Sequence, residues 1–347
     1  MIVRRLAVVF GGVSSEHEVS MASGEAVLKA LEQTAYEVTP VIIDRDGSWA
    51  IRDPTTPLAR QLQTEPRHSV ALGVEILRQR SIDLVFVALH GIGGEDGTFQ
   101  ELLDTVGLRY TGSDVASSSL CFDKATSKNV VQRHEVAVAK SVIVSRDDTR
   151  AGPRSLAQRV SAEVGLPCFV KPNASGSSVG AGPVKVVADL IPAIERATAE
   201  DLQGRALIER YLVGRELSVG VIERGGCAQA LPPVEIRSAT EFFDYDAKYT
   251  VGMAEELCPA PIPEHLDQSC RDAALRCHEV LGCSGFSRVD FIEDHGVPYF
   301  LECNTIPGLT PNSLLPKMAR ANDLTFERLI ETIIEAAAFG ERNLETA

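Results

Sequence analysis

The stretch FSRVDFIEDHGVPYFLECN, residues 286–304, has the pattern of two short strands joined by a tight turn. Asp290, Glu302 and Asn304 fall near one end of this predicted hairpin. Because side chains alternate along a strand, Glu302 and Asn304 share one face, and Asp290 can meet them from the neighbouring strand. Two carboxylates and an amide oxygen are hard ligands that suit Mg²⁺ shared with substrate phosphates. The hairpin is therefore a candidate metal site.

The same hairpin end also has a simpler interpretation, as an exposed turn with solvated acidic side chains. Spacing alone leaves the two interpretations about equal. Ser287, Arg288 and Asn304, however, interrupt runs of apolar residues such as Phe286 and Phe300. Polar groups within a buried pair of strands need polar partners, which favours a functional site.

The first third of the chain, far from the hairpin in sequence, alternates strand-like and helix-like patterns. This alternation predicts an open parallel α/β sheet. Such sheets bind ligands in the loops at the carboxyl ends of their strands. The expected strands cover residues 4–12, 38–44 and 84–91, and the expected helices cover 20–31 and 70–80.

Two loops of this region carry candidate ligand-binding side chains. GGVSSEHEVS, residues 11–20, contains Glu16 and Glu18, and HGIGGEDGT, residues 90–98, begins with His90. The acidic residues also fit a purely structural role at a helix N-terminus, where the helix dipole stabilises carboxylates. A lone histidine beside a glycine-rich turn usually has a structural role.

The middle of the chain predicts a helical segment over 113–133 and a second βαβ-like unit. Its strands are expected at 141–144 and 167–172, its helix at 156–164, and a loop of small residues, NASGSSVG, follows at 173–180. The backbone N–H groups of such a loop can cradle phosphate, although a flexible turn is the commoner explanation. Lys171 precedes the loop within an apolar strand, where a lysine is costly to bury unless it meets an anion.

The last third predicts strands at 206–212, 216–223 and 228–236, an irregular polar stretch at 237–256, and helices at 266–281 and 325–339. Within the irregular stretch, FDYDAKY (243–249) concentrates tyrosines, aspartates and a lysine. Long loops of this kind are often lids over active sites.

Composition limits the functional classes. The chain has 347 residues, which suggests two or three domains, and a net charge of −14, which disfavours a nucleic-acid or anionic-membrane surface. The first apolar run is too short for a signal-peptide core, and no stretch approaches a membrane span. The eight cysteines form no CxxC pair and no zinc-ligand spacing, so we expect reduced core thiols in a cytoplasmic protein.

Six motifs occur in order along the chain: GGVSSEHEVS, ALHGIGGEDG, FDKATSK, FVKPNASGSSVG, DYDAKY and SRVDF…FLECNTIPGLTPNSLLP. Together they resemble the ATP-grasp fold, and specifically the D-alanine–D-alanine ligase family. The resemblance implies a three-domain α/β architecture with an N-terminal open parallel domain. The implied domains are an N-terminal substrate domain, a central ATP-grasp lid domain, and a C-terminal ATP-grasp and metal-binding domain, at 1–112, 113–208 and 209–347.

The family's motifs imply roles in nucleotide and metal binding, residue by residue. Lys124 and Lys171 match phosphate-binding lysines, with Ser177 and Ser178 in the loop that covers the phosphates. The segment that links the second and third domains matches the adenine and ribose contacts, through Glu209, Leu212 and Glu216. The metal ligands for Mg²⁺ (or Mn²⁺) match Asp290, Glu302 and Asn304.

The remaining roles concern the amino-acid substrates. Glu16 resembles the residue that takes the ammonium of the first D-alanine, and Arg288 and the N–H of Gly308 match the oxyanion stabilisers. The second substrate's carboxylate matches Ser313 and Leu314 at the start of a helix, a ready carboxylate site. His90 is a further candidate substrate contact, and Lys248 and Tyr249 lie in the lid, where Tyr249 is expected to join Ser177 and Glu16 in holding it shut.

The implied activity is ATP-dependent ligation of two D-alanines through an acyl phosphate, for peptidoglycan precursor synthesis, and the family suggests a homodimer. The alternatives are a relative with another acceptor, namely D-serine, D-lactate or a secondary-metabolism amino acid, and a catalytically inactive nucleotide-binding module. The retained pair Lys248-Tyr249 favours an amine acceptor. Three positions depart from the common pattern: Phe243 and Pro183, which bear on lid closure and nucleotide affinity, and Arg215.

Overall fold

The computed structural model describes residues 3–52, 66–176, 179–238 and 254–339. Its first sheet has the strand order β4-β3-β2-β1-β5. β1 pairs in parallel with β2 and with β5, so the predicted parallel core is confirmed, while β3 and β4 add an antiparallel edge that the periodicity did not reveal. The strand bounds are β1 Arg5–Gly11, β2 Glu37–Ile43, β3 Trp49–Ile51, β4 Arg67–His68 and β5 Leu84–Val87.

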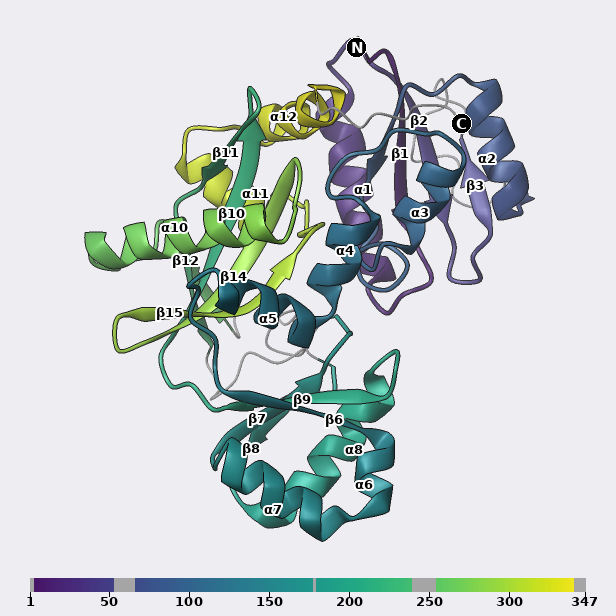
Figure 1. Cartoon of the computed structure of the whole chain (residues 1–347). Helices are drawn as coiled ribbons and strands as arrows, with labels where there is room; N and C mark the ends of the chain where they lie inside the picture. The colour runs from purple at the N-terminus through teal and green to yellow at the C-terminus, as the bar shows by residue number, and fades with distance from the viewer. Residues whose placement is uncertain (1–2, 53–65, 177–178, 239–253, 340–347) are drawn as a thin grey trace.

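Three helices accompany this sheet, as Figure 1 shows: α1 (His17–Leu31), α2 (Val70–Gln79) and α3 (Thr98–Thr105). α1 begins three residues before the predicted start at Ser20 and packs closely on β1. Gly24 makes this approach possible, because a Cβ there would collide with the ring of Phe10. The short distance between helix and sheet places the N-terminal end of α1 beside the carboxyl ends of the strands.

The central sheet has the order β6-β9-β7-β8 and forms a separate layer at the bottom of Figure 1. Its strands are β6 Ser141–Ser145, β7 Cys168–Pro172, β8 Gly182–Val184 and β9 Arg205–Arg210. The helices α6 (Arg146–Ala151), α7 (Pro153–Glu163) and α8 (Leu190–Glu200), with the short 3₁₀ helix η2 (Val187–Asp189), complete this unit. They enclose a hydrophobic core of their own, which includes Val160, Val170 and Ile208.

The third sheet contains the hairpin of residues 286–304. β14 (Phe286–Asp294) pairs antiparallel with β15 (Val297–Asn304) and with β10 (Arg215–Arg224), so both predicted hairpin strands are confirmed. The remaining strands of the sheet are β11 (Cys227–Ala230), β12 (Val234–Ser238) and β13 (Ala254–Leu257), and its helices are α10 (Glu264–Val280), α11 (Leu314–Ala321) and α12 (Phe326–Phe339).

Two predicted segments are divided in the structure. The helical stretch 113–133 forms α4 (Val115–Phe122) and α5 (Lys124–Arg133), separated by Asp123, which has extended dihedral angles and caps α5 through Thr126 N–H. The predicted strand 228–236 is also interrupted, because Pro232 and Pro233 separate β11 from β12 and proline lacks the N–H that a ladder needs.

The first and third sheets share a hydrophobic core, in which residues of β1 and β5 join Phe286 and apolar residues of α11 and α12. α4 and α5 pack against β15 in a second core. Loops from all three sheets therefore meet in one place, beside the end of the β14–β15 hairpin. Among the described residues, no helix combines the length and apolar character needed to cross a membrane.

Candidate active site

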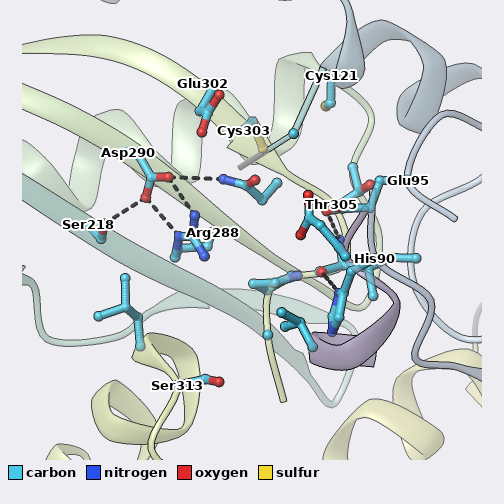
Figure 2. A pocket seen from close by; sticks show the side chains of 18 of the residues that line it. His90, Glu95, Cys121, Ser218, Arg288, Asp290, Glu302, Cys303, Thr305 and Ser313 are labelled. Atoms are coloured by element: carbon cyan, nitrogen blue, oxygen red, sulfur yellow. Dashed lines mark hydrogen bonds and ion pairs between the residues drawn. The ribbon is translucent and has the colours of Figure 1, made fainter. Parts of the chain in front are cut away.

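A cavity of about 520 Å³ lies where these loops meet. Its wall includes the start of α1, the loop after β5, the end of β15 and the N-terminus of α11 (Figure 2). Eleven residues expected to be functional line it: Glu16, His90, Lys124, Glu216, Arg288, Asp290, Glu302, Asn304, Gly308, Ser313 and Leu314.

Asp290, Glu302 and Asn304 lie together as the hairpin pattern predicted. Asp290 is paired in register with Glu302, and Arg288 is paired with Asn304, with an irregularity in the ladder directly after Asp290. The Asn304 Nδ2 donates to Asp290 Oδ2 at 3.0 Å. With its nitrogen engaged in this way, the amide would offer its oxygen to a cation beside the two carboxylates.

Arg288 binds Asp290 through two hydrogen bonds, from Nε at 2.8 Å and from Nη2 at 2.7 Å. Ser218, on β10, donates to Asp290 Oδ1 at 2.6 Å, and both contacts are drawn in Figure 2. Burial by itself would lower the pKa of the Arg288 guanidinium, but the adjacent Asp290 carboxylate raises it above its ordinary value. Arg288 is thus a fixed positive charge directed at the carboxylates.

Lys124, the first residue of α5, connects two parts of the site. Its Nζ donates to the carbonyl of Ser175 at 2.8 Å and lies 3.2 Å from Glu302 Oε2. The lysine therefore ties the loop after β7 to the hairpin. The charged residues Asp290, Glu302, Arg288 and Lys124 are called the hairpin cluster below.

Lys171 does not line the cavity, and the anion that it meets in the structure is a carboxylate. Its Nζ lies 2.7 Å from Glu209 Oε2, while Lys128 Nζ lies 2.8 Å from Glu209 Oε1. Lys128 also donates to the carbonyl of Phe300 at 2.6 Å. These three charged residues, Lys128, Lys171 and Glu209, are called the β9 cluster.

The β9 cluster is almost completely buried, and this affects its pKa values. Burial lowers the pKa of Lys128 to about 8, against the opposing effect of Glu209. Burial would raise the pKa of Glu209, but the two ammonium groups hold it below its ordinary value. Glu209 is therefore an ionised carboxylate shared by two lysines.

Glu16 lies at the meeting point of three loops. A Cβ at Gly176 would collide with its Oε1, and one at Gly91 would approach the same atom at 3.2 Å. Glu95 is half-buried nearby, in the cavity wall, and accepts hydrogen bonds from the N–H groups of Gly91 and Ile306. Burial, with the charge of Glu16 as a second cause, raises the pKa of Glu95 to about 8. At neutral pH, Glu16 thus has a neutral carboxylic acid beside it.

His90 links the first sheet to the loop that follows β15. Its Nδ1 lies 2.9 Å from the Ile306 carbonyl, so Nδ1 carries the proton and Nε2 accepts from the Ser23 hydroxyl at 2.8 Å. Ser23 in turn accepts from Leu309 N–H at 3.2 Å. Burial lowers the pKa of His90 to about 4, which keeps the ring neutral. Although His90 lines the cavity, these bonds make it a support for the loop that carries Gly308.

That loop leads into α11, and Ser313 occupies the N-cap position at the helix start, as expected, without a side-chain capping hydrogen bond. Ser313 Oγ accepts from Thr310 N–H at 3.2 Å and lies close enough to Gly308 that a Cβ there would crowd it. Leu314 is the first helical residue. Unsatisfied N–H groups at a helix start favour an anion, so this wall of the cavity can receive a carboxylate.

The other expected residues lie apart from the cavity or outside the described residues. Leu212 is half-buried in the connection between β9 and β10, whereas Glu216, on β10, lines the cavity. Pro183 occupies the edge strand β8, where a missing N–H is tolerated, and Arg215 begins β10. The residues outside the described part of the chain are Ser177, Ser178, Phe243, Lys248 and Tyr249.

Sequence reasoning missed four contributors: Ser23, Glu95, Lys128 and Ser218. Three had a usable signal. Glu95 lies within the glycine-rich motif 90–98, and Lys128 follows Lys124 by four residues, on the same helix face. Ser218 is a polar residue within an apolar strand, the same signal that identified Ser287, and Ser23 gave no signal.

Sequence comparison identifies the family. The family models described as D-ala D-ala ligase N-terminus and D-ala D-ala ligase C-terminus match residues 5–113 and 130–335. The chain is 39% identical over 336 residues to the D-alanine--D-alanine ligase of Desulforudis audaxviator (strain MP104C), covering 97% of this chain and 99% of the relative. It is 38% identical over 336 residues to that of Geotalea uraniireducens (strain Rf4), covering 96% of each.

Solved structures give the same result. The VanG D-Ala:D-Ser ligase from Enterococcus faecalis superposes with a TM-score of 0.85 at 31% identity, over 97% of this chain and 100% of that one. The D-alanine--D-alanine ligase from Bacillus anthracis complexed with ATP superposes with a TM-score of 0.74 at 30% identity, over 96% and 97%. The ATP-grasp fold expected from the motifs is confirmed, and this chain belongs to the D-alanine–D-alanine ligase family.

Proposed function

We propose that this enzyme joins two D-alanine molecules to D-alanyl-D-alanine, with ATP as the second substrate, and so supplies a peptidoglycan precursor. The observation that carries the proposal is the convergence in one cavity of Glu16, the hairpin cluster and the N-terminus of α11. A carboxylate is a poor electrophile, so the first D-alanine is activated as an acyl phosphate and is then attacked by the amine of the second.

The amino acids are placed by groups of opposite charge. Glu16 receives the ammonium of the first D-alanine, and the neutral state of Glu95 leaves Glu16 as the negative charge at that point. The start of α11, at Ser313 and Leu314, receives the carboxylate of the second D-alanine. Arg288 and the Gly308 N–H stabilise the oxyanion of the tetrahedral intermediate, a contribution of about 3–4 kcal/mol for a well-placed donor.

Nucleotide binding is assigned to residues of the second and third proposed domains, of which Lys124 and Glu216 line the cavity. Lys124 and Lys171 offer positive charge to the phosphates, with Ser177 and Ser178 in the covering loop. Backbone groups at Glu209 and Leu212 hold the adenine, and Glu216 holds the ribose. Lys248 and Tyr249 belong to the lid, which excludes water from the acyl phosphate.

The residues of the hairpin fit a hard divalent cation. Asp290, Glu302 and Asn304 present two carboxylates and an amide on register pairs separated by the pair Val289–Cys303, a donor set typical of Mg²⁺ or Mn²⁺ sites. When bound, Mg²⁺ supplies positive charge that neutralises the phosphate oxygens. Arg288 and Lys124 neutralise the same carboxylates in the structure described here.

Further proposals concern the domain boundaries, the oligomeric state, the location in the cell and the partners of the enzyme. The domain boundaries are proposed at 112/113 and 208/209. The enzyme is proposed to be a homodimer and to work in the cytoplasm, where its substrates are small molecules. With a net charge of −14, nucleic acid is not among its proposed partners.

The activity is tested by mass analysis of products from ATP, Mg²⁺ and D-alanine, together with phosphate release. We expect phosphate release that depends on D-alanine and a product with the mass of the dipeptide, and neither with L-alanine as control. ATP hydrolysis without any dipeptide would contradict the proposal.

A D-serine acceptor is the second candidate, because a structural neighbour is named as a D-Ala:D-Ser ligase. Competition of D-alanine against D-serine and D-lactate decides the acceptor. We expect D-alanyl-D-alanine to dominate at neutral pH, and Tyr249→His to raise the share of D-lactate product. A dominant D-serine or D-lactate product from the unmodified enzyme would overturn the acceptor assignment and leave the ligase reaction intact.

A further inference from the structure

Three cysteines that are far apart in the sequence meet beside the cavity. Cys121 lies on α4, Cys283 in the turn after α10, and Cys303 on β15. The Sγ of Cys283 lies 3.7 Å from that of Cys121 and 3.8 Å from that of Cys303, and all three sulfur atoms lie within 4.8 Å of one another. These three residues are called the thiol cluster, and the proposed ligase reaction does not use it.

The distances match those that a bound metal ion requires. With metal–sulfur bonds of about 2.3 Å, neighbouring thiolates are about 3.8 Å apart in a tetrahedral site and about 4.0 Å apart in a trigonal one. Two of the three sulfur–sulfur distances in the thiol cluster already have about these values. An ion would therefore need only a small adjustment of side chains.

The surroundings favour a soft ion. All three cysteines are buried in an apolar core with Val131 and Phe300. Cys303 alternates with Glu302 and Asn304 on β15, which places its side chain on the opposite face of the strand from the oxygen ligands. Mg²⁺ prefers oxygen, whereas thiolates select soft ions such as Cu⁺ and Zn²⁺.

We propose that the thiol cluster binds one soft d¹⁰ metal cation, Zn²⁺ or Cu⁺, and that its occupancy lowers ligase turnover. Each thiol that coordinates the ion loses its proton to solvent. Cys121 and Cys303 both line the cavity, which gives the ion a route to the site (Figure 2). Turnover falls because Cys303 lies between Glu302 and Asn304 on β15, so even a small shift of Cys303 toward the metal moves the two proposed Mg²⁺ ligands beside it.

The binding test uses reduced, metal-free enzyme titrated anaerobically with Cd²⁺ in excess Mg²⁺. We expect a sulfur-to-metal charge-transfer absorbance that saturates at about one Cd²⁺ per chain. Cys283→Ala removes the central thiol, which is outside the cavity wall, and should weaken the apparent affinity about 100-fold or more. Cys227→Ala, on the exposed strand β11, is the matched control and should bind as the unmodified enzyme does.

Competition then identifies the occupant: displacement of Cd²⁺ by Zn²⁺ supports a divalent site, and displacement by Cu⁺ alone supports a monovalent one. A parallel experiment measures turnover. Cd²⁺ should lower the turnover of the unmodified enzyme and of Cys227→Ala, and a dithiol chelator should restore it. The turnover of Cys283→Ala should not change. Cys283→Ser replaces the alanine variant if that variant does not fold. An equal absorbance in Cys283→Ala, displacement by Mg²⁺, or no absorbance at all would overturn the site; equal inhibition of Cys283→Ala would overturn its link to turnover.

Discussion

The hairpin cluster and the β9 cluster both contain buried charges, but they differ in balance. In the hairpin cluster, two carboxylates face two cationic side chains, Arg288 and Lys124. In the β9 cluster, the single carboxylate of Glu209 faces Lys128 and Lys171. The first cluster is formally neutral and the second has one excess positive charge, so the second is the better electrostatic match for a phosphate.

The two clusters also differ in depth. The side chain of Glu302 is 26% exposed, whereas those of Lys128 and Glu209 are 3% and 4% exposed. A deeply buried ion pair that loses one partner leaves a costly unpaired charge, while a more exposed group is replaced at lower cost. We therefore expect substitutions in the hairpin cluster to affect turnover, and substitutions in the β9 cluster to affect stability as well.

Glu302→Gln should have the largest effect. It keeps the shape of the side chain but removes one of the two carboxylates proposed to hold Mg²⁺, so turnover should fall by about 100-fold or more with little change in unfolding. Initial rates at several Mg²⁺ concentrations measure this. Glu293→Gln, at the far end of β14, is the control. A near-normal Mg²⁺ dependence of Glu302→Gln would contradict the proposed position of the metal site.

Substitutions of the two lysines of the β9 cluster should distinguish an effect on ATP binding from an effect on stability. Lys171→Met should weaken ATP binding about 10-fold or more, because Lys171 is the proposed phosphate ligand. Lys128→Met should instead lower the free energy of unfolding by about 2–3 kcal/mol, because it also removes the hydrogen bond to the Phe300 carbonyl. ATP titration and urea unfolding of both variants provide the comparison; equal ATP affinities would make Lys171 a structural residue.

Glu95 borders the hairpin cluster and should make stability depend on pH. Its pKa rises to about 8 on folding, so between its ordinary value of 4.5 and about 8 the folded state holds a proton that the unfolded state releases. Stability should therefore fall as the pH rises through this interval, by about 3–4 kcal/mol from pH 5 to 8. Urea unfolding at both pH values measures the loss, and Glu95→Gln should reduce it; an unchanged loss in this variant would contradict the assignment.

His90 should produce the smallest change in stability, and its contribution should depend on pH in the opposite direction to that of Glu95. Its pKa falls from 6.5 to about 4 on folding, so the unfolded state gains a proton first as the pH is lowered. The stability contributed by neutral His90 is complete above pH 6.5 and should fall by about 1 kcal/mol between pH 6.5 and 5.5. His90→Asn retains a donor for the Ile306 carbonyl and should remove this slope, which thermal unfolding at the two pH values can check.

Much of the hairpin cluster could be predicted because its information is local. Strand alternation placed Glu302 and Asn304 on one face, and the short turn brought Asp290 beside them. Lys171 was predicted to meet an anion for a sound physical reason, but the sequence pointed to phosphate, whereas the structure supplies Glu209 from another strand. The partner of a buried charge depends on strand order, which the hydrophobic pattern does not contain.

The parallel core of the first sheet, the hairpin and the glycine-rich loops follow from the sequence itself, because they depend on side-chain periodicity and turn chemistry within a few residues, whereas the helix start at Ser313 was implied by the family resemblance. The neutral Glu95 and the meeting of Cys121 with Cys283 and Cys303 depend on the tertiary structure. The cysteine spacing contained no metal-site pattern, yet packing of α4 on β15 brings the thiols together. Contacts between residues more than a hundred positions apart are decided by how complete elements pack, since only packing determines which side chains share a buried space.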